Sequence, residues 1–175
     1  SLFISISQSA AIFCVEWIRF ACSRFYPGST PGSEALERSA LTIEFTVCAA
    51  ICLMAASASI FFSVPGKIAV FGGMVAIFQG GSDLHLTMLR FRQEFRAFSR
   101  LQGSRATILA VGTLAGAAVA PNFTCTVAGW LAGYVAYSIW AGFLTRNSLR
   151  EAAHFEPPLV RKHFVYGSVA ASASV

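Results

Sequence analysis

One continuous apolar segment constrains this chain more than any other feature. Residues 41–64 read LTIEFTVCAAICLMAASASIFFSV and contain a single charged side chain, that of Glu44, near the start. About 20 apolar residues suffice for a helix to cross the hydrocarbon core of a bilayer. The segment therefore predicts a transmembrane helix, and the Pro65-Gly66 pair that follows it predicts a tight turn.

Three further segments are predicted as spans, at residues 68–89, 106–120 and 123–144. The second half of the first of them is more polar and carries Gln79, Asp83 and His85. Gly80 and Gly81, just before Asp83, leave two interpretations open. The helix either continues through the two glycines, or breaks there and a new helix begins.

The composition supports a membrane protein. The 175 residues are 55% hydrophobic and only 12% charged, whereas a soluble domain usually carries about 25% charged residues. We predict an all-α, polytopic bundle of four transmembrane helices. Residues 1–25 are either a fifth span or a helix on the membrane surface. The predicted organisation is an N-terminal segment with a Pro/Gly linker at 1–40, a transmembrane domain at 41–145 and a polar tail at 146–175.

The helix at 68–89 is predicted to continue past the membrane as an amphipathic helix through residue 100. Arg92, Arg96 and Arg100 recur every fourth residue and would form a basic surface along one side of it. The end of the tail, GSVAASASV, consists of small residues and predicts an extended or disordered terminus.

The distribution of basic residues predicts the topology. With four spans, 12 of the 13 lysines and arginines lie in the regions on one side, and only Lys67 lies opposite. Basic residues stay on the side from which a membrane chain inserts. The loop at residues 90–105 and the C-terminus are therefore predicted to share one side.

Small residues at four-residue spacing form the clearest motif. Gly112 and Gly116 are one Gly-x-x-x-Gly pair, and Gly129 and Gly133 are another. Lipid gives no hydrophobic drive between helices, so helices associate where small residues let their backbones approach. With a turn at 121–122 between the two pairs, we predict a closely packed helical hairpin.

No pattern in the chain is typical of catalysis. Nothing resembles a nucleophile and its base, a phosphate-binding loop or a metal cluster, so we predict a protein that is not an enzyme and holds no metal. His85 is the one histidine near a span and is the candidate haem or chlorophyll ligand; Asp83 is a second intramembrane polar group. Neither cofactor is required by the sequence, and the structural alternative is an interfacial cap or a buried hydrogen bond. The cysteines are expected to pack as small apolar thiols.

The order of motifs resembles the mitochondrial inner-membrane preprotein translocase family, which includes an accessory subunit of respiratory complex I. The resemblance covers about residues 40–145. It rests on Phe78, then Arg90 with Glu94, then Gly112 with Gly116. It extends to the hairpin VGTLAGAAVAPNFTCTVAGWLAGYVAYSIWAG, which is similar to the last two helices of the complex I subunit.

The resemblance implies a non-catalytic accessory subunit of a large organelle membrane complex, most consistent with the respiratory chain. It also implies the mitochondrial inner membrane, with the basic loop and the C-terminus on the matrix side. The expected partners are other membrane subunits and an anionic lipid such as cardiolipin, and no nucleic acid. Two alternatives stay open: a protein-translocating or solute-conducting subunit, and an accessory subunit of a photosystem in which Asp83, His85 or Asn122 binds chlorophyll.

Overall fold

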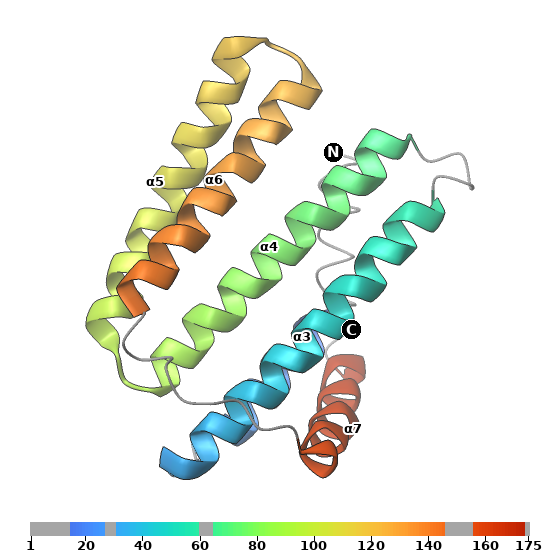
Figure 1. Ribbon diagram of the computed structural model, residues 1–175, viewed down its shortest axis with the longest axis vertical. Coiled ribbons are helices and arrows are strands. Elements are labelled where there is room, and N and C mark those ends of the chain that lie inside the picture. The colour runs from blue at the N-terminus through green and yellow to red at the C-terminus, as the bar shows by residue number, and fades with distance from the viewer. Residues whose placement is uncertain (1–14, 27–30, 60–64, 146–155, 174–175) are drawn as a thin grey trace. The chain divides into compact units, whose positions relative to one another are not determined.

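The computed structural model describes residues 15–26, 31–59, 65–145 and 156–173. This part of the chain contains six helices and no strand, which confirms the all-α class (Figure 1). The helices are α2 (Trp17–Phe25), α3 (Pro31–Ser59), α4 (Gly66–Phe91), α5 (Phe95–Val119), α6 (Phe123–Thr145) and α7 (Pro157–Ala173). They form two compact units, one made of residues 1–93 with 151–175 and the other of residues 94–150.

The first unit contains α2, α3, α4 and α7. Helices α3 and α4 run side by side as a hairpin (Figure 1), and α2 packs against α3, α4 and α7. The hydrophobic core of this unit draws Ile18 and Cys22 from α2, Leu41 and Cys48 from α3, and Leu84 from α4. The nine-residue helix α2 is thus the element around which the longer helices pack.

The glycine pair in α4 does not break the helix. α4 continues through Gly80 and Gly81, so the alternative of a new helix at this point is wrong. A Cβ on Gly80 would lie 2.7 Å from a methyl carbon of Val15, and one on Gly81 would lie 3.0 Å from the ring of Phe45. The two glycines are therefore sites where neighbouring side chains approach the α4 backbone.

The predicted amphipathic helix across residues 89–100 is also wrong. α4 ends at Phe91, and α5 begins at Phe95. Between them Gln93 adopts a φ of 59°, in the left-handed region that ends a right-handed helix. The predicted span at 106–120 is the second half of α5, which runs as one helix from Phe95.

The C-terminal tail also departs from expectation. Residues 157–173 form the helix α7, so the predicted extended or disordered terminus is wrong for residues 167–173. Pro157 and Pro158 open α7, as suits residues whose fixed φ matches the first helical turn. Of the ambiguous N-terminal segment, residues 17–25 form the short helix α2, and residues 1–14 lie outside the described residues.

Two helical segments, Ser33–Ala58 and Phe123–Thr145, are long and apolar enough among the described residues to cross a membrane. The bundle of four spans is therefore not confirmed. The polar residues Gln79, Asp83 and His85 lower the hydrophobicity of α4. The first half of α5 carries three arginines, and its second half is rich in glycine and alanine, which are weakly hydrophobic.

The second unit is the hairpin of α5 and α6, which lie side by side along their length (Figure 1). The turn at residues 120–122 joins them. The side-chain oxygen of Asn122 accepts a hydrogen bond of 2.8 Å from the backbone N–H of Cys125, which caps the first turn of α6. The cap explains why α6 begins directly after this residue.

Candidate functional site

The closest approach within the α5–α6 hairpin is made by the four predicted glycines. A Cβ on Gly112 would lie 2.5 Å from the carbonyl oxygen of Gly129. One on Gly116 would lie 2.9 Å from the Cα of Gly129, and one on Gly133 would lie 3.2 Å from the Cα of Leu109. Backbone meets backbone here, so the hairpin is held by dispersion contacts that any larger residue would remove.

Hydroxyl groups along the hairpin form hydrogen bonds within their own helices. Thr113 donates to the carbonyl of Leu109 at 2.7 Å, Ser138 to that of Tyr134 at 2.8 Å, and Thr145 to that of Ala141 at 2.8 Å. Such bonds to the carbonyl four residues earlier satisfy each hydroxyl within its own helix. These three hydroxyls therefore do not join the two helices, and the contact between α5 and α6 is one of packing.

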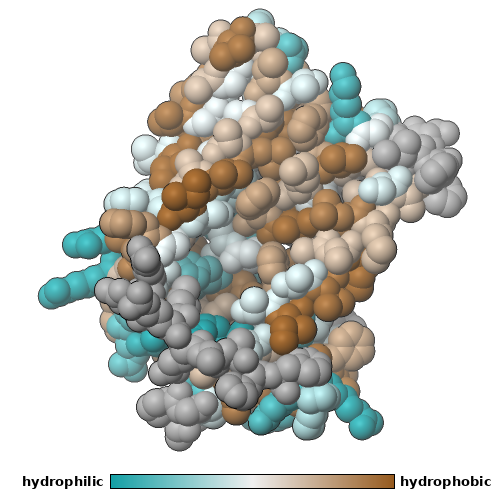
Figure 2. All heavy atoms as spheres, in the orientation of Figure 1, coloured by the Kyte–Doolittle hydropathy of each residue, from teal (hydrophilic) through white to brown (hydrophobic). Residues whose placement is uncertain are grey.

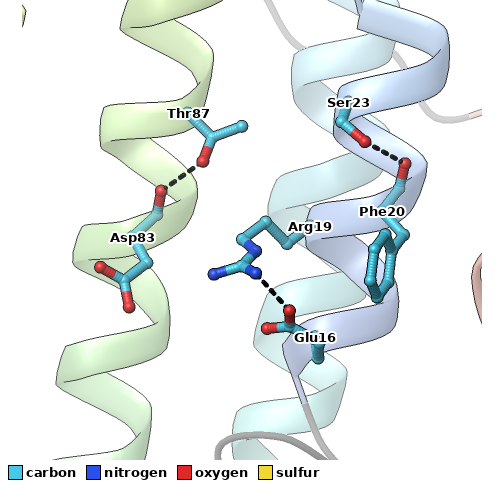
Figure 3. A network of polar contacts seen from close by, with 6 residues as sticks. All are labelled: Glu16, Arg19, Phe20, Ser23, Asp83 and Thr87. Atoms are coloured by element: carbon cyan, nitrogen blue, oxygen red, sulfur yellow. Dashed lines mark hydrogen bonds and ion pairs between the residues drawn. The ribbon is translucent and has the colours of Figure 1, made fainter. Parts of the chain in front are cut away.

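The intramembrane candidates Asp83 and His85 lie on α4. The backbone carbonyl of Asp83 accepts a hydrogen bond of 2.7 Å from the hydroxyl of Thr87, as Figure 3 shows. His85 is half-buried, and its Nε2 is fully enclosed. Among the described residues, no three histidine, cysteine, aspartate or glutamate side chains are grouped to hold a metal ion.

The three arginines of the predicted basic surface do not share a helix. Arg96 and Arg100 are exposed on α5, whereas Arg92 lies in the turn before it. The Nε of Arg92 is 3.1 Å from Oε1 of Glu34, and the hydroxyl of Tyr26 donates to the same oxygen at 2.9 Å. Arg92 thus joins the end of α4 to the start of α3 within the first unit.

The structure brings together a polar cluster that the sequence did not predict. His163 of α7 is fully buried between Glu37 and Glu44 of α3. Its Nδ1 lies 3.0 Å from Oε1 of Glu44, within hydrogen-bond geometry. Its Nε2 lies 2.7 Å from Oε2 of Glu37, in a close charge contact that is poorly aligned for a hydrogen bond. We call these three residues the Glu–His–Glu cluster.

The charges of the cluster favour a protonated imidazole. Burial disfavours the charged form of His163, but the hydrogen bond to Glu44 and the charges of both glutamates outweigh it. Together they raise the pKa of His163 above its usual value of 6.5. A buried charge is tolerated only with such partners, so the cluster fastens α7 to α3 by charge.

Aromatic packing closes the cluster on the α2 side. The ring of Phe25 stacks on the imidazole of His163 with 5.3 Å between ring centroids. One helical turn later, a Cβ on Gly167 would meet the backbone of Trp17 and lie 3.0 Å from its ring. Trp17 also contacts Phe164 edge-on at 5.4 Å. α7 is therefore held by charge on α3 and by close contact on α2.

Part of the cluster had a signal in the sequence. Glu37 and Glu44 are seven residues apart, two helical turns, and so project from one face of a helix. Because residues 1–40 were predicted as an N-terminal segment with a linker, Glu37 was not expected on the helix that carries Glu44. The histidine partner lies 119 residues from Glu44, and no local pattern connects them.

Three of the described cysteines, Cys22, Cys48 and Cys52, are buried, as small packing residues are, and Cys14 lies outside the described residues. None of the four described cysteines forms a disulfide. Burial, with a smaller contribution from the charge of Glu37, raises the pKa of the Cys22 thiol to about 12. A thiol that is neutral at physiological pH is a poor nucleophile and a poor metal ligand.

Comparison with models of protein families, with curated proteins and with solved structures finds no match to this chain.

Proposed function

We propose that this chain is a non-catalytic accessory subunit of a hetero-oligomeric membrane complex. In this role its helices pack against other membrane subunits and against lipid, and they help to hold the complex together. The two helical segments long and apolar enough to cross a membrane support the membrane location.

The observation that carries the proposal is the distribution of side-chain size around the α5–α6 hairpin. Glycines form the inner contact, while large apolar side chains point outward. Leu114 is 69% exposed on α5, and Ile139 and Phe143 are 70% and 71% exposed on α6. Figure 2 shows hydrophobic residues at the surface over much of the visible face. Lipid or apolar partner helices would cover these side chains, because large apolar side chains that gather on one exposed surface mark an interaction site.

The non-catalytic part of the proposal rests on the role of the buried polar groups. Glu37, Glu44 and His163 pair with one another and join two helices. The finer assignment, to the respiratory chain in the mitochondrial inner membrane, rests on the resemblance to the translocase family together with the one-sided distribution of basic residues.

The test is purification of the tagged chain from its native membranes in a mild detergent. We expect a defined set of other membrane proteins to co-purify in constant ratio. The variant Ile139→Ser/Phe143→Ser should lose them while keeping its helix content. The control Phe95→Ser replaces an aromatic residue that is 60% exposed and lies outside the apolar half of α5, and it should keep them. Recovery of the chain as a lone monomer from intact membranes would contradict the proposal.

A further inference from the structure

An open groove with a volume of about 820 Å³ runs between the end of α2 and the outer face of α7. Its walls are mostly apolar. Phe25 contributes the α2 side, and Pro157, Val165 and Val169 contribute the α7 side. All four of these residues lie in the first unit, so the groove belongs to a single compact part of the molecule.

Two cations line the groove, between the prolines that open α7 and the two valines farther along it. Arg161 and Lys162 both line it and are both exposed. The ammonium nitrogen of Lys162 is 4.3 Å from the centroid of the Phe25 ring, a cation–π contact that holds it against the wall. No acidic side chain is among the described residues that line the groove. Its charge is therefore uniformly positive.

Backbone N–H groups at the start of α7 do not add to the attraction of this groove for anions. Pro157 and Pro158 have no N–H, and the N–H groups of Leu159 and Val160 donate to the carbonyl of Glu156. The start of α7 thus offers few free donors, and an anion in the groove depends on the side chains of Arg161 and Lys162.

The cations and the apolar wall are aligned. Residues 161, 165 and 169 are spaced four apart, so they form one line on α7 that is about 12 Å long. Val165 and Val169 are 57% and 64% exposed along this line. A pair of cations beside an exposed apolar track matches a molecule with an anionic head and a hydrocarbon chain.

We propose that this groove is a binding site for an anionic phospholipid. The phosphate would contact Arg161 and Lys162, and an acyl chain would lie along Val165 and Val169. The inference rests on the proposed membrane location, which supplies the ligand. It adds a defined site on α7, apart from the apolar surface of the α5–α6 hairpin.

The test measures lipid binding to the purified chain in a nonionic detergent by native mass spectrometry. The probes are dioleoyl phosphatidylglycerol, dioleoyl phosphatidylcholine and inorganic phosphate. We expect phosphatidylglycerol to bind at one site more tightly than either of the others. Arg161→Gln/Lys162→Gln should weaken it about thirtyfold, because each basic residue near anionic lipid contributes roughly fivefold in affinity.

The matched control is Arg96→Gln/Arg100→Gln, which removes the same charge from exposed positions on α5 and should change the affinity less than about twofold. Val165→Asn keeps both cations, adds no charge and makes the apolar track polar, so it should weaken lipid binding by about tenfold or more. This variant decides the question if the double variant fails to fold. The proposal would be overturned if the two double variants lost affinity equally or if the two lipids bound equally. It would also be overturned if inorganic phosphate bound as tightly as phosphatidylglycerol. Because this assay uses the isolated chain, its failure is separate from a failure to co-purify with partners.

Discussion

The Nδ1 atom of His163 lies 3.0 Å from Oε1 of Glu44, although 119 residues separate them in the chain. Through this bond and the contact with Glu37, the last described helix is fixed to α3 rather than to its neighbours in sequence. Because two carboxylates hold this buried imidazole, the docking of α7 depends on the presence and the protonation of His163.

Removing that residue should detach α7. In His163→Ala the two glutamates would remain buried without their cation, and breaking a buried pair in this way costs about 3–5 kcal/mol. Hydrogen exchange of the α7 amides should accelerate strongly, with little change in α5 and α6. The control is Ser168→Ala, an exposed position on the same helix whose hydroxyl bonds only its own helix. Protection of α7 equal to the parent protein would contradict the assigned role.

The same docking should weaken as the pH rises. The folded-state pKa of His163 is raised above 6.5, so protonation stabilises the folded form. That contribution is fully present below pH 6.5 and is lost as the pH rises through the folded-state pKa. The groups facing the imidazole are Glu37 and Glu44 from α3 and the ring of Phe25 from α2, with Lys162 beyond that ring.

The measurement is α7 amide protection, corrected for intrinsic exchange, between about pH 6 and pH 9. Protection should fall with rising pH in the parent protein, and the His163→Gln variant should show no such fall. Protection that is constant, or that increases with pH, would show that the imidazole docks in its neutral form.

Local patterns predicted the helices well where one signal dominated. The predicted span at 123–144 corresponds to α6 at Phe123–Thr145, and that at 68–89 corresponds to α4 at Gly66–Phe91. Both segments begin after a Pro-containing turn and are apolar at their start. The Gly-x-x-x-Gly spacing also led to the residues that make the α5–α6 contact, because helix geometry alone places residues four apart on one face.

The errors have a physical pattern of their own. α7 was missed because its sequence is neither apolar throughout nor regularly amphipathic, and it is held by a few specific contacts at His163 and Gly167. The boundary at Gln93 was missed because a left-handed glutamine has no strong local signal. Features that depend on contacts between segments far apart in the chain could not be predicted from local sequence patterns.

Two glycines of α6, one inside the contact with α5 and one outside it, should respond in opposite ways to substitution by alanine. Gly129→Ala should destabilise the hairpin by about 1–3 kcal/mol, because the added methyl group meets the backbone of Gly112 and Gly116. A Cβ on Gly142 meets nothing within 4 Å, so Gly142→Ala should stabilise α6 by about 0.5–1 kcal/mol. Thermal unfolding in detergent measures both. An equal response of the two variants would disprove the close contact.

The predicted topology can be tested with single cysteines in a chain whose native cysteines are replaced. With four spans, a cysteine at Gly66 lies at the start of α4 beside Lys67, and one at Gly103 lies in the arginine-rich region on the other side. Gly103 has nothing within 4 Å of its Cβ position, so the substitution is sterically free. We expect a membrane-impermeant thiol reagent to reach the two positions from opposite faces. Labelling of both from the same face would eliminate the four-span arrangement.

We propose that the exposed apolar side chains of α3, such as Met54 at 64% exposure, and those of the α5–α6 hairpin lie within a membrane. Extraction of native membranes at alkaline pH tests it most directly, because this treatment strips proteins held at the surface by charge and leaves embedded ones in the pellet. We expect the chain to stay with the membrane pellet and to enter solution only with detergent, as part of a particle much larger than its own 18.7 kDa. Release of the chain into the detergent-free supernatant as a stable folded monomer would contradict the membrane location.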